Sequence, residues 1–214
     1  MIRRSNLSIR EDLDTAVTGL PAESQTVLST PRLVLRTYRE EDLPGLAELN
    51  GDREVVRFLG GRPMTREDSD ALAGRIAASW AADGLGMIAV ERRADGALLG
   101  MAGLDESPWH PGQIEVGWRL APQHWGQGYA TEAGAAWLEH GFGARALSRI
   151  IAIADADPPN VASIAVMRRL GMSLDHQAEL DDHGERFEAV VYAITAQDWF
   201  AASAVHDVVR QPHG

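Results

Sequence analysis

The stretch Gln123-His124-Trp125-Gly126-Gln127-Gly128-Tyr129-Ala130 contains the residues best suited to hold a ligand. Two glycines at alternate positions follow an extended apolar run and lead directly into a small-residue helix. A glycine-rich turn at a helix N-terminus presents several backbone N–H groups in one direction, and the helix dipole adds a partial positive charge. The glycines also let a ligand approach the backbone without meeting a Cβ atom. The stretch therefore predicts a site for a phosphate or pyrophosphate group.

Two common phosphate-binding motifs do not fit this loop. A P-loop has the pattern Gly-x-x-x-x-Gly-Lys-Ser/Thr, and no lysine follows these glycines. A dinucleotide-binding fingerprint requires Gly-x-Gly-x-x-Gly, and Thr131 stands where the third glycine would be. What remains is the pattern Gln-x-x-Gly-x-Gly after a strand, from Gln123 to Gly128.

Hydrophobic periodicity and turn signals predict the elements that must position the loop. The expected strands cover residues 32–38, 86–92, 98–104, 114–120, 150–154, 172–177 and 187–194. The expected helices cover residues 41–50, 53–59, 65–82, 129–141 and 160–170. Strands and helices in this order predict an α/β fold, with a mixed sheet that carries helices on both faces.

Composition limits the class of protein. The chain has 214 residues, 45% of them hydrophobic, which is enough for one globular domain with a full core. Its formal net charge is −11, and no basic stripe with interleaved aromatic residues is present, so we do not expect a nucleic-acid partner. Residues 1–28 are polar and acidic, and we expect a partly disordered N-terminal extension there.

The absence of cysteine excludes disulfides, thiolate metal sites and a cysteine nucleophile. The seven histidines show no His-x-x-x-His spacing, so we expect no metal site. No run of about 18 apolar residues occurs, and the N-terminus has no hydrophobic signal region. We therefore expect a cytoplasmic protein that does not associate with a membrane.

The glycine loop resembles the coenzyme A pyrophosphate loop of the GNAT N-acyltransferases. The run from Trp125 to Ala133 is similar to the branch that includes the ribosomal-protein N-terminal (alanine/serine) acetyltransferases. Two further segments resemble that branch in the right order. They are Thr30-Pro31-Arg32-Leu33-Val34-Leu35-Arg36 with Asp42, and Asn160-Val161-Ala162-Ser163 followed by Leu170-Gly171-Met172.

The resemblance implies a GNAT fold over residues 29–214, as a single acetyltransferase domain. Such a fold has a mostly antiparallel central sheet of about six or seven strands, splayed between the fourth and fifth strands. The splay would expose backbone groups of the strand Trp118-Arg119-Leu120 to the pantetheine arm of acetyl-CoA. The implied cofactor contacts are Trp118, Arg119, Leu120, Gln123, His124, Trp125, Gly126, Gln127, Gly128, Tyr129, Ala130 and Asn160.

Acetyl transfer to an amine also needs a base, and Glu115 is our candidate. It lies in an apolar strand, and alternation places it on the face of Gly117, whose missing side chain leaves space. A partly buried carboxylate accepts a proton more readily near neutral pH. The alternative is that Glu115 pairs with an arginine. His110 is the second candidate for the base, and we expect Trp109 and His110 to contact the acceptor.

The resemblance implies that Asn160 contacts pantetheine and that Ser163 protonates the departing thiolate. An asparagine that caps a helix after two prolines has a structural explanation as well. Many GNAT enzymes carry a tyrosine acid four residues before the glycine that corresponds to Gly171. Here that position is Met167, and a thioether cannot donate a proton.

These observations favour an acetyl-CoA-dependent N-acetyltransferase. Its acceptor would be the primary amine of a protein or peptide N-terminus or of a small molecule, attacking directly in a ternary complex. The alternative is a non-catalytic acyl-CoA sensor or regulatory module. The sequence leaves a monomer and a homodimer equally open.

Overall fold

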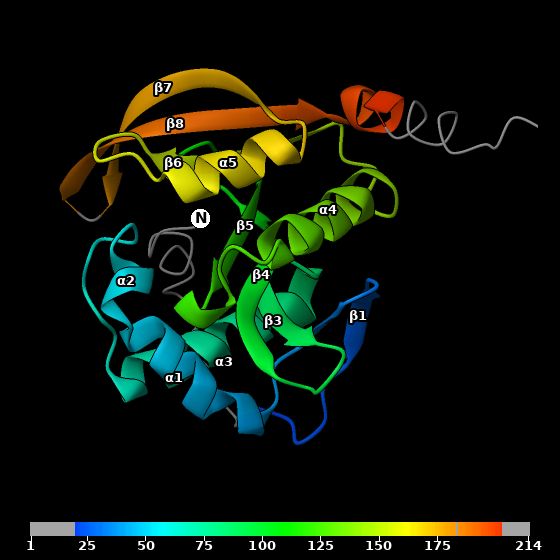
Figure 1. Ribbon diagram of the computed structural model, residues 1–214, viewed down its shortest axis with the longest axis vertical. Helices are drawn as coiled ribbons and strands as arrows, with labels where there is room; N and C mark the ends of the chain where they lie inside the picture. Colours follow the sequence, from blue (N-terminus) through cyan, green and yellow to red (C-terminus); the bar gives the residue numbers. More distant parts are fainter. Residues whose placement is uncertain (1–19, 183, 203–214) are drawn as a thin grey trace, which may run out of the picture.

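An eight-stranded sheet forms the centre of the molecule in a computed structural model that describes residues 20–182 and 184–202 (Figure 1). The strand order is β1-β2-β3-β4-β5-β6-β8-β7. The strands are β1 (Thr26–Ser29), β2 (Leu33–Arg36), β3 (Gly86–Arg92), β4 (Leu98–Glu106), β5 (Ile114–Leu120), β6 (Arg149–Asp155), β7 (Ser173–Asp182) and β8 (Glu185–Thr195). Among these strands, neighbours pair antiparallel except β5 and β6, which are parallel.

Helices cover both faces of the sheet. They are α1 (Leu43–Gly51), α2 (Arg53–Val56), α3 (Arg66–Asp83), α4 (Tyr129–Phe142) and α5 (Val161–Arg169), with short 3-10 helices at Glu40–Asp42 and Pro122–His124. Side-chain alternation along β3 explains the two layers. Met87 and Ala89 pack in a cluster with α1, α2 and α3, whereas Ile88 and Val90 pack in a cluster with α4 and α5.

The expected α/β fold is confirmed, with one more strand than the seven expected. The additional strand, β1, is a four-residue edge strand that pairs antiparallel with β2. Its two apolar residues, Val27 and Leu28, are adjacent and do not alternate with polar ones, so periodicity does not predict it. Strand β7 extends to Asp182, beyond the expected residue 177, because it pairs with β8 through its whole length. Residues 1–19 of the expected extension lie outside the described residues.

Strands β5 and β6 diverge, as the expected splay requires. Their pairing consists of one register pair, Glu115 with Ile151, near the start of both strands. By contrast, β4 and β5 pair at seven positions, from Glu106 with Ile114 to Gly100 with Leu120. The sheet is therefore continuous on one side of β5 and open on the other toward the C-terminal end of β5.

No helix in the described part of the chain is long and apolar enough to cross a membrane.

A buried ion pair joins β2 to the turn that follows it. The Arg36 guanidinium donates to both carboxylate oxygens of Asp42, at 2.7 and 2.8 Å, and both side chains are 3% exposed. Arg36 also donates to Glu91 on β3 at 2.8 Å. Asp42 accepts in addition from the backbone N–H of Arg39. The pair therefore fixes the path of the chain from β2 into α1.

We expect Asp42→Ala to lower the free energy of unfolding by about 3–5 kcal/mol, because it leaves the Arg36 charge buried with a weaker set of partners. Glu41→Ala is the matched control, since the Glu41 side chain is 78% exposed and lies 3.6 Å from Arg39. This control should change stability by less than about 0.5 kcal/mol. Urea denaturation of both variants measures the difference, and equal stability would contradict the prediction.

Candidate active site at the parted strands

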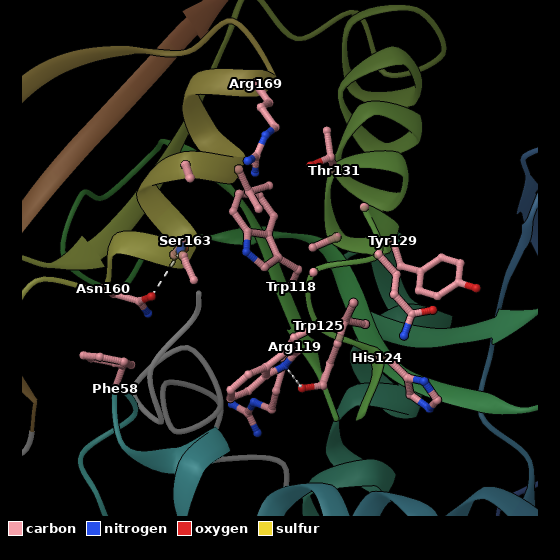
Figure 2. Close-up of a pocket in the computed structure, with 18 of the residues that line it drawn as sticks. Phe58, Trp118, Arg119, His124, Trp125, Tyr129, Thr131, Asn160, Ser163 and Arg169 are labelled. Atoms are coloured by element: carbon pink, nitrogen blue, oxygen red, sulfur yellow. Dashed lines mark hydrogen bonds between the residues drawn. The ribbon is translucent and has the colours of Figure 1, made fainter. Parts of the chain in front are cut away.

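A cavity of about 650 Å³ occupies the opening beside β5 (Figure 2). Its wall comes from β5, the glycine loop, the first turn of α4, helix α5 and the region of α2. The lining residues are Glu54, Phe58, Trp118, Arg119, Leu120, His124, Trp125, Gly126, Gln127, Gly128, Tyr129, Ala130, Thr131, Asn160, Ala162, Ser163, Ala165, Val166 and Arg169. In Figure 2, Asn160 and Ser163 on α5 lie across from Tyr129 and Thr131 on α4, with Trp118 between them.

The glycine loop presents the start of α4 to this cavity. Gly126 and Gly128 have φ values of 73° and 80°, a left-handed conformation that favours glycine. Gly128 is the N-cap of α4, and no side chain caps the helix there. The N-cap residue therefore offers no side-chain acceptor to the first-turn N–H groups of α4, which lie at the cavity wall where a helix dipole favours an anion.

Contacts from the N-terminal part of the chain fix the glycine loop. Arg32 donates to the carbonyl oxygen of Gln127 at 3.0 Å and to the Glu132 carboxylate at 2.5 Å. Its guanidinium also lies 4.7 Å from the centre of the Tyr129 ring. Thr30 donates to Glu132 at 2.5 Å. The segment Thr30–Arg36 therefore supports the glycine loop in the folded chain, although the two are far apart in sequence.

The ladder between β4 and β5 determines which backbone groups face the cavity. The N–H of Ala121 donates to the carbonyl of Leu99, one position beyond the register pair of Leu120 with Gly100. Hydrogen-bonded and non-hydrogen-bonded pairs alternate in an antiparallel ladder, so the backbone groups of Leu120 and Trp118 point away from β4, toward the opening. The Leu120 carbonyl accepts from the Trp125 indole N–H at 2.7 Å. The backbone of Arg119 instead faces β4.

Helix α5 contributes a buried hydroxyl. Asn160 caps the helix by accepting from the backbone N–H of Ser163 at 3.1 Å, and both residues are 3% exposed. Ser163 lines the cavity, and its buried hydroxyl has no hydrogen-bond partner within the described residues. A buried hydroxyl without a partner costs free energy. A ligand with a polar atom near Ser163 would remove that cost.

The charge of the cavity wall is opposite to that of the chain. The sequence carries a formal charge of −11, but among the described residues that line the cavity, the two arginines Arg119 and Arg169 stand against one carboxylate, that of Glu54. Burial, and then the nearby Arg92, lower the pKa of His124 below its usual value, so this histidine is neutral at pH 7. The wall is therefore suited to an anionic ligand.

Most of the predicted cofactor contacts meet at this cavity. Trp118, Arg119, Leu120, His124, Trp125, Gly126, Gln127, Gly128, Tyr129, Ala130, Asn160 and Ser163 all line it. Gln123 does not line the cavity, but its carbonyl oxygen accepts from the Gln127 side chain at 2.9 Å and supports the loop. Three predicted residues, Glu115, Trp109 and His110, are not among the lining residues.

Glu115 is fully buried, at the position where β5 and β6 are paired before they diverge. Trp109 and His110 lie in the loop between β4 and β5 and contact the β7–β8 hairpin instead of the cavity. The Trp109 indole donates to the carbonyl of Asp181 at 2.8 Å, and its ring packs against Phe187. His110 contacts His176. The roles predicted for these three residues therefore remain predictions.

Sequence reasoning missed two charged cavity residues from separate helices, Glu54 and Arg169. A signal for Glu54 is present, because Asp52 caps α2 by accepting from the N–H groups of Glu54 and Val55. That cap predicts where α2 begins. It does not predict that α2 faces the opening beside β5, which depends on the packing of α1 and α2 on the sheet.

The fold and the glycine loop agree with a comparison against known families. Residues 32–173 match the family described as the acetyltransferase (GNAT) domain. This chain belongs to the GNAT family and is an acetyltransferase. Among curated proteins, it is similar to the uncharacterized N-acetyltransferase YnaD of Bacillus subtilis (strain 168). The two are 28% identical over 174 residues, which cover 80% of this chain and 98% of YnaD.

Two solved structures from Vibrio cholerae share the fold. One is a putative ribosomal-protein-serine acetyltransferase, with a TM-score of 0.66 and 19% identity over 82% of this chain and 99% of its own. The other is a spermidine N-acetyltransferase in complex with CoA and spermine, with a TM-score of 0.65 and 18% identity over 80% of this chain and 99% of its own. At these identities the likeness establishes the fold alone.

We expect Gly128→Ala to weaken coenzyme A binding at least tenfold, about 1.4 kcal/mol. An added Cβ would sit 3.4 Å from Arg32 in a left-handed conformation that alanine adopts at a cost, and the loop would shift. Gly112→Ala is the matched control, because Gly112 has nearly the same φ, 79°, and open space around it, outside the cavity lining. Calorimetry should show unchanged affinity in the control, and equal losses in both variants would contradict the prediction.

Proposed function

We propose that this protein transfers an acetyl group from acetyl-CoA to a primary amine by direct attack in a ternary complex. The observation that supports this most strongly is the convergence of three features on one cavity. These are the uncapped start of α4 behind the glycine loop, the outward-facing backbone of Trp118 and Leu120, and the buried hydroxyl of Ser163. Each suits a different part of an acyl-CoA molecule.

The residues present fit coenzyme A. Backbone N–H groups from the glycine loop and the first turn of α4 would hold the pyrophosphate, aided by the positive end of the helix. The Trp118 backbone would pair with the pantetheine amides as a strand does, and Asn160 lies opposite. A cavity of about 650 Å³ is within the usual range for small-molecule sites.

Acetyl-CoA supplies a thioester carbonyl, and the chain would supply the groups that stabilise charge around it. A backbone N–H near Leu120 would donate to the developing oxyanion, a role typically worth about 2.7–4 kcal/mol. Ser163 would donate a proton to the departing thiolate. The Met167 side chain cannot do so, because it is a thioether and is fully buried in the core.

The acceptor ammonium must lose a proton before it attacks, and two carboxylates are candidates to accept it. Glu115 lies where β5 and β6 begin to diverge but does not line the cavity, so it would act through a bridging water. Glu54 lines the cavity from α2, beside Phe58. We assign the base to Glu115 and propose that Glu54 attracts the cationic acceptor, because an exposed carboxylate at the wall suits binding better than proton abstraction.

The acceptor is a primary amine of a peptide N-terminus or of a small molecule. The two Vibrio cholerae neighbours are named for acceptors of these two kinds, a ribosomal protein and spermidine. A non-catalytic acyl-CoA sensor would use the same cofactor contacts but would not need Ser163 or Glu54 at the cavity.

A thiol-release assay with acetyl-CoA and a panel of amines and short peptides tests this proposal. We expect turnover with one acceptor class and a fall in kcat of about 10–100-fold in Ser163→Ala, since removing a proton donor slows thiolate departure. Ser107→Ala is the matched control, because Ser107 is also 3% exposed with an unpartnered hydroxyl in the described structure but does not line the cavity. Tight coenzyme A binding without thiol release across the panel would favour the sensor.

Two isosteric variants separate the carboxylates. Glu115→Gln should lower kcat about 100-fold and leave the coenzyme A affinity unchanged, if its carboxylate is the base. Glu54→Gln should instead raise KM for the acceptor, with kcat within about threefold of the wild type. Matching thermal unfolding midpoints would show that both variants fold. A large kcat loss in Glu54→Gln alone would reverse the assignment.

A further inference from the structure

Two histidines outside the cavity lie close enough together to share a ligand. His110, in the loop between β4 and β5, and His176, on β7, are 66 residues apart in sequence. Their Nε2 atoms lie 3.3 Å apart, and the rings meet edge-on with centres 5.3 Å apart. Two nitrogen ligands on one tetrahedral zinc ion, each at 2.0–2.1 Å, are separated by about 3.3–3.4 Å. The observed separation therefore suits two ligands of one metal ion.

An irregularity in β7 orients His176. The register between β7 and β8 shifts between Leu174 and His176, so Asp175 is an extra residue in the ladder. In a regular strand, Asp175 and His176 would point to opposite faces, and such a bulge redirects side chains. Here the Asp175 carboxylate lies 2.8 Å from Nδ1 of His176. The bulge thus allows neighbouring residues to interact.

The Asp175 contact determines which ring nitrogen of His176 can bind a ligand. An ionised carboxylate accepts hydrogen bonds, so Nδ1 carries the proton and Nε2 presents its lone pair toward His110. Histidines that bind metals usually donate their second ring N–H to a carboxylate or carbonyl in this way.

The loop that carries His110 is held in place independently of the histidine contact. Trp109 is anchored to Asp181 and Phe187, and Arg149 donates to the Gln113 side chain at the end of the loop. The His110 ring is therefore fixed before any ion binds. The other ring nitrogen of His110, Nδ1, has no partner within the described residues, so no contact there holds the ring in a single tautomer. His176 is 41% exposed, which gives an ion access from solvent.

We propose that His110 and His176 bind a divalent transition-metal ion of the zinc type through their Nε2 atoms, with Asp175 orienting His176 and water completing the coordination. Imidazole ligands select zinc, copper or nickel over magnesium or calcium. The described residues contain no group of three or more histidine, aspartate or glutamate residues that could hold a metal, so this part of the chain supplies two ligands. Arg149, which forms an ion pair with Asp175 at 2.8 Å, adds a positive charge nearby and limits affinity.

A bound ion would join the β4–β5 loop to β7 across the end of the sheet where β5 and β6 are paired. The site lies outside the cavity lining and does not depend on acetyl transfer. It also differs from the sequence expectation of no metal site, which rested on the absence of close histidine spacing. These two histidines come from separate elements and meet only in the folded chain.

Metal titration of the full chain, after treatment with a chelator, tests the proposal. We expect one Co²⁺ ion to bind with a visible spectrum typical of nitrogen ligands and to be displaced by one Zn²⁺ ion. His110→Ala and His176→Ala should each weaken Zn²⁺ binding at least tenfold by calorimetry. Asp175→Asn should weaken it about 10–100-fold. Zn²⁺ should raise the thermal unfolding midpoint of the wild type but not of the two histidine variants.

His140→Ala is the matched control, because His140 on α4 packs against Trp137, away from the pair. This variant should bind Zn²⁺ as the wild type does. The chain has seven histidines, so binding by itself does not identify the site. Zn²⁺ affinity that is unchanged in both His110→Ala and His176→Ala, or no binding to the wild type, would overturn the proposal.

Discussion

The separation of β5 from β6 is the constraint on which the rest of the site depends. Buried backbone N–H and C=O groups require hydrogen-bond partners, so two strands that part leave groups for a ligand, a side chain or water to satisfy. Here the pairing is limited to Glu115 with Ile151, and the backbone of Trp118 and Leu120 faces the opening. The Trp125 indole satisfies one of these groups, the carbonyl of Leu120. The same separation makes room for the cavity.

The elements around the opening maintain it from both faces of the sheet. Helices α4 and α5 pack in one core cluster, and their N-terminal ends meet at the cavity. On the other face, Arg119 donates to Asn50 of α1 at 2.6 Å, and Asn50 in turn donates to Ser69 of α3 at 2.9 Å. This buried network ties β5 to two helices. The candidate site is therefore a product of the whole core and not of the glycine loop alone.

The two sites in the molecule show different relations between sequence and structure. The glycine loop is a local feature, because its turn and the helix that follows depend on adjacent residues. The histidine pair joins residues 66 positions apart and requires both the bulge at Asp175 and the anchored loop of Trp109. Glu54 and Arg169 also reach the cavity from separate helices. Such residues carry no local pattern that could reveal them.

The sequence by itself determined the α/β class and seven of the eight strands, because these depend on periodicity and turn residues. It also determined the family, through the resemblance that the glycine loop and two further segments carry. Only the tertiary structure decided that β1 joins the sheet, that Glu54 and Arg169 line the cavity, and that Trp109 and His110 pack on the β7–β8 hairpin. It also buried Glu115 at the point where the strands are still paired. These placements depend on contacts between distant segments, which packing of the core selects and no local pattern encodes.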